Sequence, residues 1–228
     1  MKLFKKYWEI FTKLEKYCLI TAFALILFCT FIFNDSKIAV LNAFLGIMYT
    51  TLAGKGKVDC FYFGLAGSSL YCILAFTNNL WGNLLLYALY YIPMQTLGIF
   101  KWNKNLDATK DVIIKSQLNN RERLMYGSIT ILITLITISV LHLTGDKSPV
   151  FDGITTIFSI LGMVLTVGRK IEQWIIWIIV NGLSAVMWLN VALQGENVYS
   201  TVIMWVVYFI MAINFFIQWK KELKKTLY

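Results

Sequence analysis

The sequence predicts an all-α membrane protein with eight transmembrane helices arranged 1+3+1+3, in which two parallel three-helix repeats are joined by a linker helix. Composition, the position of basic charge and an internal repeat lead to this fold class. Hydrophobic residues make up 58% of the 228 residues and charged residues only 14%. In soluble domains, about a quarter of the residues are charged. The composition therefore favours a chain that lies mostly in a lipid bilayer.

Eight apolar runs are the expected spans, and several reach the roughly 17 to 25 residues that cross a bilayer as a helix. The runs are Tyr17–Phe33, Ile38–Ala53, Val58–Phe76, Leu80–Phe100, Leu124–Leu143, Phe151–Val167, Trp174–Leu193 and Tyr199–Trp219. The first run is long for a signal peptide and lacks a clear small-residue cleavage site, so we expect it to be retained. We expect it to pack on the periphery, because it lies outside the repeat.

Basic residues fall in alternate gaps between these runs. All of the 21 Lys and Arg residues except Lys37 and Lys147 lie in the head, the second, fourth and sixth gaps, or the tail. Cytoplasmic loops retain basic charge, so the pattern predicts a plasma (inner) membrane protein with both termini in the cytoplasm. The net charge of +9 also attracts anionic lipid. We expect no nucleic-acid partner, since no basic face with interleaved aromatic residues lies outside the spans.

Two halves of the chain resemble each other. Leu45, Gly46 and Thr50 recur as Leu161, Gly162 and Thr166, and Tyr91, Met94, Trp102 and Lys104 recur as Tyr208, Met211, Trp219 and Lys221. This divides the chain into a head with the first span (1–37), a first repeat (38–100), a loop with the linker span (101–150), a second repeat (151–221) and a tail (222–228). Because one span separates the repeats, they are parallel. Parallel repeats are typical of transporters that bind substrate near the midplane between them.

The seventh run carries polar and aromatic residues on one helical face. Trp174, Trp177, Asn181, Ser184 and Trp188 are spaced by three or four residues, which aligns them along one side of a helix. An interfacial role for Trp174 and an interhelical hydrogen bond for Asn181 are the structural alternatives. The depth of Trp177 and Asn181 favours a binding site for a flat polar ring.

The fourth run repeats this pattern with Tyr87, Tyr91, Gln95, Gly98 and Trp102. Pro93 removes a backbone hydrogen bond and predicts a kink, which serves either as a hinge or for static packing. Asn79 and Asn83 at the outer end either cap helices or join the site. The complete candidate set for substrate binding is Trp174, Trp177, Asn181, Gln95, Asn83, Tyr91 and Asn214.

Catalytic and metal-binding patterns are missing from the spans. The single histidine, His142, lies at an outer boundary, and the four cysteines show no metal-like spacing. Asp59, Asp152 and Glu172 lie near span ends, whereas proton and Na⁺ coupling usually needs embedded acidic or histidine side chains. We therefore expect no enzyme activity, no cofactor and no metal, and favour uncoupled facilitated diffusion. Na⁺ coupling through carbonyl or hydroxyl oxygens stays open.

The stretches Asn83–Tyr87 and Tyr91–Gln95, with Trp102 and Asn105, resemble the PnuC family of vitamin transporters. Glu172, Gln173, Trp174, Trp177 and Asn181 match that family's Trp-x-x-Trp and Asn pattern. The resemblance covers about residues 38 to 221. It implies a 3+1+3 fold related to the SWEET sugar transporters, a homotrimer, and uptake of nicotinamide riboside trapped by a cytoplasmic kinase.

The same resemblance implies that Gln95, Trp174, Trp177 and Asn181 contact the substrate. Tryptophan faces attract a flat cation such as nicotinamide riboside, but they would suit thiamine equally. Transport of thiamine or riboflavin, a vitamin-binding subunit of an ATP-driven importer, and a SWEET-like sugar carrier are the alternatives.

Overall fold

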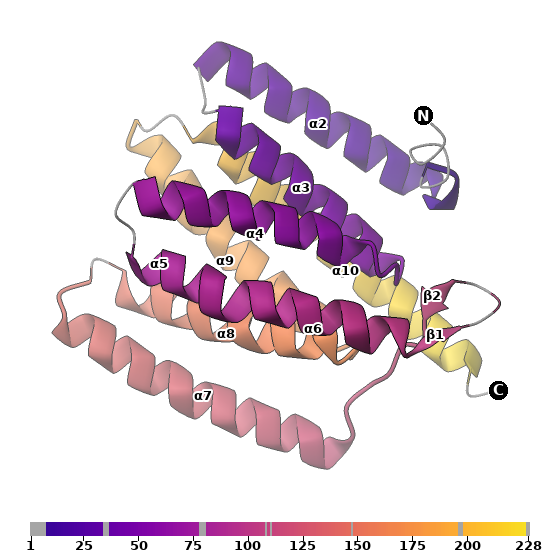
Figure 1. Cartoon of the computed structure of the whole chain (residues 1–228). Helices are drawn as coiled ribbons and strands as arrows, with labels where there is room; N and C mark the ends of the chain where they lie inside the picture. The colour runs from indigo at the N-terminus through magenta and orange to yellow at the C-terminus, as the bar shows by residue number, and fades with distance from the viewer. Residues whose placement is uncertain are drawn as a thin grey trace.

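The computed structural model describes residues 8–33, 37–77, 81–107, 109, 111–146, 148–195 and 198–226. These residues form an all-helical bundle with one small two-stranded hairpin (Figure 1). The helices are α2 (Lys13–Phe33), α3 (Lys37–Gly54), α4 (Cys60–Thr77), α5 (Trp81–Leu86), the π-helix η1 (Tyr87–Tyr91), α6 (Ile92–Asn103), α7 (Asn120–Leu143), α8 (Pro149–Val167), α9 (Gln173–Leu193) and α10 (Tyr199–Thr226). The hairpin strands are β1 (Leu106–Asp107) and β2 (Val112–Ile113).

Within the described residues, five helices are long and apolar enough to cross a membrane, namely α2, α7, α8, α9 and α10. Shorter apolar segments occupy Val40–Gly54 in α3 and Cys60–Ile73 in α4. Only 11% of the apolar window of α7 is buried inside the protein. An apolar helix with so much exposed surface requires lipid or a partner around it.

The irregularity predicted around Pro93 takes the form of a π turn just before the proline. The N–H of Ile92 donates to the carbonyl of Tyr87, one residue further back than in an α-helix. Pro93 follows directly in the same continuous helix, where it has no N–H to donate to the preceding turn. Single π turns inside helices are frequent at functional sites.

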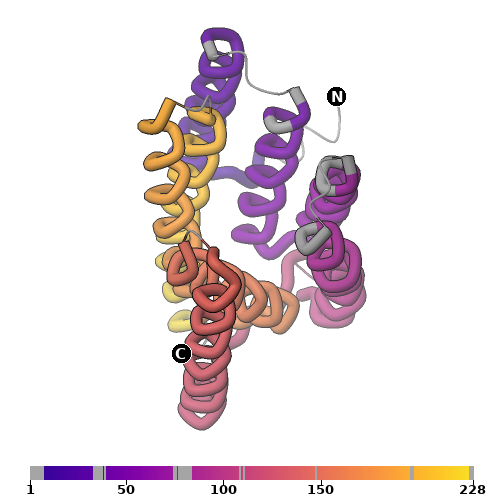
Figure 2. Tube along the Cα trace, turned by 90° about the vertical axis from the view of Figure 1, so that its left-hand side faces the viewer, coloured from indigo at the N-terminus to yellow at the C-terminus, as the bar shows by residue number. Residues whose placement is uncertain are grey.

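Six helices pack in a closed ring, which we call the six-rod ring and which Figure 2 shows nearly end-on. Each rod contacts the next in the order α3, α4, α6, α8, α9, α10, and α10 returns to α3. The order of contacts in α3, α4 and α6 is therefore the same as in α8, α9 and α10, as a twofold rotation requires. α2 packs outside the ring on α10 and α3, and α7 packs outside on α8.

Two buried tryptophans form hydrogen bonds between the two halves of the ring, one half being α3, α4 and α6 and the other α8, α9 and α10. Trp102 of α6 donates its indole N–H to the carbonyl of Thr166 in α8 at 3.0 Å. Trp219 of α10 donates to the carbonyl of Gly54 in α3 at 2.7 Å. Both side chains are fully buried. The repeated tryptophans thus join each half to the end of the first helix of the other half.

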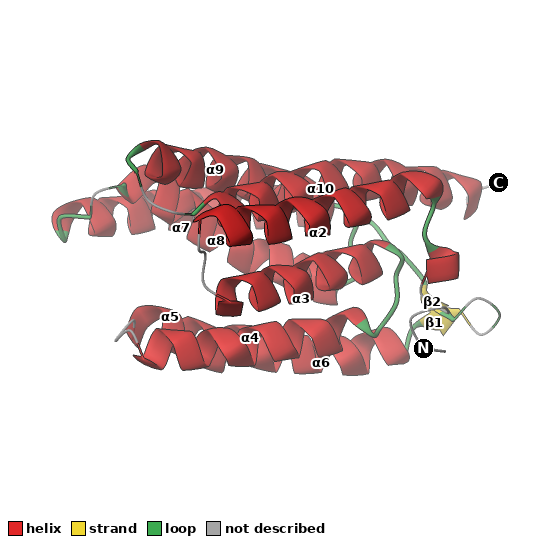
Figure 3. Ribbon diagram, turned by 90° about the horizontal axis from the view of Figure 1, so that it is seen from above, coloured by secondary structure: helices red, strands yellow, loops and turns green. Residues whose placement is uncertain are grey.

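The start of α2, the end of α10 and the hairpin lie at one end of the bundle, which we call the hairpin end (Figure 1, Figure 3). The described Lys and Arg residues other than Lys37 belong to the turns and helix ends on this side. Lys37 begins α3 at the opposite end. Lys2, Lys5, Lys6, Lys110 and Lys147 lie outside the described residues.

The loop that contains the hairpin bridges both halves of the ring, although the sequence predicted only a basic loop here. The N–H of Ile113 donates to the carbonyl of Gly56 between α3 and α4 at 2.9 Å. Ser116 accepts from the N–H of Ile171 at 2.9 Å and donates to the carbonyl of Arg169 at 3.0 Å, in the turn between α8 and α9. Gly56 has a φ of +69°, a conformation that favours glycine.

The contact between α4 and α6 depends on Gly98. A Cβ at this position would lie 2.3 Å from the ring of Phe61, which is itself fully buried and packs edge-on against Trp102 at 4.8 Å. We expect Gly98→Ala to destabilise the protein by about 1–3 kcal/mol because the ring has no room to move. Thermal melting of the purified protein measures this loss.

Gly127 in α7 provides the matched control, since a Cβ there meets nothing within 4 Å. Gly127→Ala should leave the melting temperature unchanged or raise it, because alanine favours a helix by roughly 1 kcal/mol over glycine. Equal melting of Gly98→Ala and the wild type would show that α4 and α6 do not pack this closely.

Candidate functional site

A cavity of about 480 Å³ lies inside the ring, and helices from both halves line it. This volume falls within the roughly 300–1,000 Å³ typical of small-molecule sites. Residues of α3, α4, η1 and α6 form one side, and residues of α8, α9 and α10 form the other. Among the described residues that line it, none is Asp, Glu, Lys, Arg or His. The cavity is therefore uncharged, and aromatic rings supply much of its wall.

One face of α9 forms the longest wall. Gln173, Trp174, Trp177, Asn181 and Trp188 all line the cavity, and the intervals of three, four and seven residues from Trp174 to Trp188 keep these side chains on one helical face. Gln173, Trp174 and Asn181 are 0%, 2% and 4% exposed. These three side chains are therefore enclosed by the protein and not exposed to lipid.

The ring of Trp177 is held in a fixed orientation by α8. Its indole N–H donates to the hydroxyl of Thr166 at 3.1 Å, and that hydroxyl donates to the carbonyl of Gly162 at 2.8 Å. A Cβ at Gly162 would approach the Trp177 ring to 3.0 Å. The missing side chain at Gly162 thus lets the Trp177 ring pack closely against α8, and Trp177 also lines the cavity.

The opposite wall comes from the π turn and α6. Tyr87 and Tyr91 lie one π turn apart, with ring centroids at 4.8 Å, and Tyr87 also stacks on Tyr71 of α4 at 4.2 Å. Gln95 follows one turn later and donates its Nε2 to the hydroxyl of Ser68 at 3.0 Å. This wall combines aromatic faces with one oriented amide.

Most of the unpaired buried polar atoms in the described part of the chain belong to residues that line this cavity. In the described part of the chain, five of the six such atoms belong to residues that line it: Gln95 Oε1, Gln173 Nε2, Gln173 Oε1, Trp174 Nε1 and Trp205 Nε1. The sixth, Thr134 Oγ1, lies in α7. Buried polar groups are nearly always hydrogen-bonded. The cavity therefore presents donors and acceptors that water or a polar ligand must satisfy.

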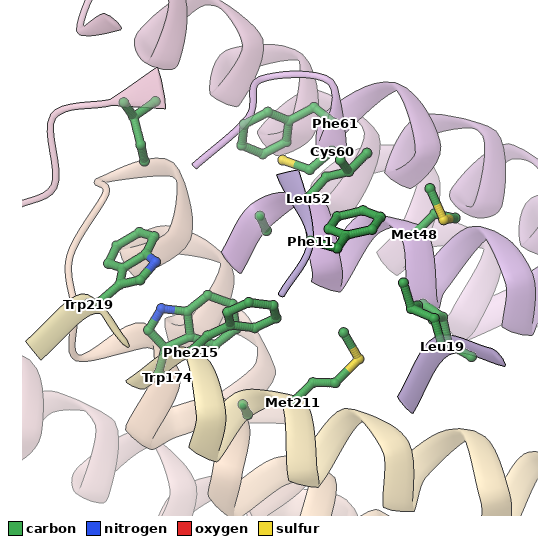
Figure 4. Close-up of a cluster of buried hydrophobic side chains, with 14 of the residues drawn as sticks. Phe11, Leu19, Met48, Leu52, Cys60, Phe61, Trp174, Met211, Phe215 and Trp219 are labelled. Carbon is green, nitrogen blue, oxygen red and sulfur yellow. The ribbon is translucent and has the colours of Figure 1, made fainter. Parts of the chain in front are cut away.

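The hairpin end of the cavity is closely packed. Trp174 contacts Phe215 at 5.3 Å and Trp219 edge-on at 5.7 Å between ring centroids, and Figure 4 shows these three side chains gathered together. Phe215 and Trp219 are fully buried. A ligand in the cavity therefore meets an aromatic floor at this end.

The structure brings together five of the seven residues predicted for the site, namely Gln95, Tyr91, Trp174, Trp177 and Asn181. Asn214 is not among the lining residues, and its Nδ2 lies 3.5 Å from the Glu15 carboxylate of α2. Its amide therefore faces the peripheral helix. The backbone of Asn83 belongs to α5, while its side chain and Asn79 lie outside the described part of the structure.

Several lining residues were not predicted as site residues. They include Tyr49, Ser68, Thr166, Gln173, Trp205 and Tyr208. Gln173 was detectable, because it stands four residues before Trp177 and eight before Asn181 on the same helical face. Most of the others lie on helices that are apolar on every side, where no periodic signal distinguishes the inner face.

No catalytic group is assembled among these residues. The lining contains neither a titratable base nor a nucleophile beside one, and the described residues hold no group of three His, Cys, Asp or Glu side chains that fits a metal ion. The arrangement is suited to binding a flat, uncharged or weakly charged molecule by stacking and hydrogen bonds.

Comparison with known proteins gives one consistent result. A family model described as nicotinamide mononucleotide transporter matches residues 36–221. The nicotinamide riboside transporter PnuC of Neisseria mucosa is 33% identical over 201 residues, covering 86% of this chain and 76% of that protein. The protein of the same name from Haemophilus influenzae is 29% identical, covering 84% and 83%.

A solved structure resembles the whole fold. The crystal structure of the vitamin B3 transporter PnuC superposes with a TM-score of 0.79 at 30% identity, covering 94% of both chains. The similarity therefore includes the peripheral helix α2 and the linker helix α7 as well as the six-rod ring.

Proposed function

We propose that this chain, which belongs to the PnuC family of membrane transporters, carries nicotinamide riboside through the cavity inside its six-rod ring. Membership of a transporter family excludes an enzyme. The observation that supports the substrate most directly is the cavity lining, which is uncharged and aromatic and holds unpaired amide and indole atoms. A flat pyridinium cation with an amide and hydroxyl groups complements each of these features.

The names of the relatives leave two substrates, the riboside and its phosphorylated form, the mononucleotide. A phosphate group carries about −1.5 to −2 charges near neutral pH, and burying an unpaired charge is very costly. No Lys or Arg lines the described cavity, so it offers no partner for a phosphate. The riboside instead carries one positive charge, which tryptophan faces attract by about 0.5–2 kcal/mol.

Calorimetric titration of the purified protein tests this choice. We expect nicotinamide riboside to bind and the mononucleotide to bind at least about tenfold more weakly, since a factor of ten is 1.4 kcal/mol. Glucose should not compete, because it lacks the cationic ring. Tighter binding of the mononucleotide, or of thiamine, would assign the cavity to that molecule.

For the membrane arrangement, we propose eight spans in the order 1+3+1+3, with α5, η1 and α6 acting as one span. The matching order of contacts in the two halves of the ring supports parallel repeats, and the concentration of basic residues at the hairpin end supports a cytoplasmic location of that end. The exposed face of α7 leaves room for lipid or for the homotrimer that the family resemblance implies.

Single cysteines test this orientation in a background without the four native cysteines. Asn120 at the start of α7 and Thr144 at its end are both exposed. We expect a cysteine at Asn120 to react with an impermeant maleimide only from the cytoplasm, and one at Thr144 only from outside, because cytoplasmic loops retain basic charge. Thr144 is preferable to Gly145, whose φ of +80° strains a side chain. The opposite labelling pattern would reverse the proposed topology.

The proposed transport is facilitated diffusion followed by chemical trapping. Coupling to protons needs a titratable group on the path, and the lining among the described residues has none with a pKa near neutrality. A carrier of this kind only equalises concentrations. Phosphorylation in the cytoplasm would maintain uptake, because the charged product has no partner in the cavity and would not return.

A further inference from the structure

Gln173, the first residue of α9, carries the most enclosed amide of the cavity. Its exposed fraction is 0%, and neither Nε2 nor Oε1 has a hydrogen-bond partner among the described residues. A buried amide in this condition costs free energy until both its donor and its acceptor are satisfied. One group that satisfies both must present an acceptor and a donor side by side.

The other fully buried unpaired atoms on described lining residues do not offer this combination. Gln95 has only its Oε1 free, because its Nε2 donates to Ser68. Trp174 and Trp205 can only donate, and the indole N–H of Trp177 already donates to Thr166. Among the fully buried unpaired groups of the described cavity, Gln173 alone therefore has a free donor and a free acceptor on one planar group; the less deeply buried amides of Asn42 and Asn181 also line the cavity.

We propose that Gln173 recognises the carboxamide of the substrate through two parallel hydrogen bonds, and so selects a pyridinium amide against the corresponding acid. This inference rests on the proposed function. The Nε2 of Gln173 donates to the carboxamide oxygen, and the carboxamide N–H donates to Oε1. A carboxylate has two acceptors and no donor, so it would leave Oε1 facing a negative oxygen.

The position of Gln173 on α9 also fixes the orientation of the ligand. Gln173 precedes Trp177 by four residues, a rise of roughly 6 Å at 1.5 Å per residue. A pyridinium ring against Trp177 thus places its amide substituent toward Gln173 and its ribose toward Asn181.

The loop at the hairpin end holds this start of α9 in place. Glu172 accepts from the N–H of Leu118 at 3.1 Å and pairs with the guanidinium of Arg123 at 2.8 Å. The N–H of Gln173 itself donates to the carbonyl of Lys170 at 3.1 Å. The backbone that carries the unpaired amide is therefore anchored by groups outside the cavity.

Calorimetric titrations of two proteins with two ligands, on the purified full chain, test the proposed hydrogen bonds between Gln173 and the carboxamide. The two proteins are the wild type and Gln173→Leu, and the two ligands are nicotinamide riboside and ribosylpyridinium, which lacks the carboxamide. We expect Gln173→Leu to weaken binding of the riboside about tenfold to hundredfold and binding of ribosylpyridinium by less than about threefold. Wild-type protein should also prefer the riboside to nicotinic acid riboside, and Gln173→Leu should lose most of that preference.

Gln194→Leu is the matched control, since Gln194 is an exposed residue at the end of the same helix. It should bind every ligand as the wild type does. Gln173→Leu without ligand should melt at or above the wild-type temperature, because it removes two unpaired buried atoms. Gln173→Asn, which keeps the amide but shortens its reach, should also lose affinity for the riboside alone, and it serves as the test variant if the leucine variant does not fold.

Equal losses for both ligands would overturn the assignment, because the residue would then act without the carboxamide. Lower melting of both Gln173 variants with unchanged riboside affinity would overturn it as well and make Gln173 a structural residue. Wild-type protein that binds neither pyridinium ligand would instead refute the proposed function, a result distinct from either of these.

Discussion

Trp177→Ala is expected to weaken nicotinamide riboside binding about thirtyfold to hundredfold, and Asn181→Ala about tenfold to hundredfold. Trp177 lines the cavity with its ring fixed by Thr166, so its loss removes a preoriented face for the cation, worth up to about 2 kcal/mol, together with apolar contact area. Asn181 is 4% exposed in the same wall. Losing a desolvated hydrogen bond costs about 1–3 kcal/mol.

Calorimetry and thermal melting on the same preparation separate binding from folding. Asn190→Ala is the control for Asn181→Ala, because Asn190 is exposed on the same helix. It should retain wild-type affinity. If Asn181 only joined two helices, Asn181→Ala would melt earlier while its folded fraction bound normally. Wild-type affinity in both Trp177→Ala and Asn181→Ala would place the substrate elsewhere.

Glu15→Ala is expected to produce the largest loss of stability. Glu15 is 2% exposed, and its carboxylate pairs with Lys55 at 2.7 Å and accepts from Gln218 at 2.8 Å. It therefore fastens α2 to the ends of α3 and α10. Removing one partner of a buried ion pair costs about 3–5 kcal/mol, which corresponds to a melting temperature lower by about 6–20 °C for a chain of this size.

The exposed Glu9 provides the control, and Glu9→Ala should melt within about 2 °C of the wild type, since isolated exposed charges contribute little. The double variant Glu15→Leu/Lys55→Met should recover much of the loss, because it leaves no buried charge unpaired. A Glu15→Ala protein that melts like the wild type would show that α2 is not held by this carboxylate.

The sequence predicted the helices and one wall of the site because both depend on local periodicity. Apolar run length and alternate basic gaps identified the rods, and the spacing from Trp174 to Trp188 identified the cavity face of α9. Gln173 lies four residues before Trp177 and was not included in that series, and the structure shows that its amide is enclosed and unpaired among the described residues.

What the sequence could not predict depends on contacts between distant segments. Asn214 was expected in the site, but its amide faces Glu15, because neighbouring helices decide which side of an apolar helix faces inward. Glu15 itself precedes the predicted start of the first span and was therefore missed. The hairpin has strands of two residues each, too short for a periodic signal, and depends on the carbonyl of Gly56.

Residues of the predicted internal repeat occur both in the packed core and in the cavity wall. Trp102 and Trp219 are fully buried and donate to backbone carbonyls of the opposite half. Tyr91 and Tyr208 both line the cavity, while Met211 belongs to the buried core. Gly46, Thr50 and Thr166 of the repeat also line the cavity, so the repeated residues contribute both to the packing between the halves and to the cavity wall.

Uptake of radiolabelled nicotinamide riboside by liposomes that contain only the purified protein tests the central claim most directly. We expect the riboside to reach the same concentration inside and outside, at a rate unaffected by imposed proton or Na⁺ gradients and strongly reduced by Trp177→Ala, because no Asp, Glu, Lys, Arg or His side chain lines the described cavity. Absence of uptake without an ATP-driven partner, or accumulation above the external concentration driven by either gradient, would contradict a self-sufficient uncoupled carrier.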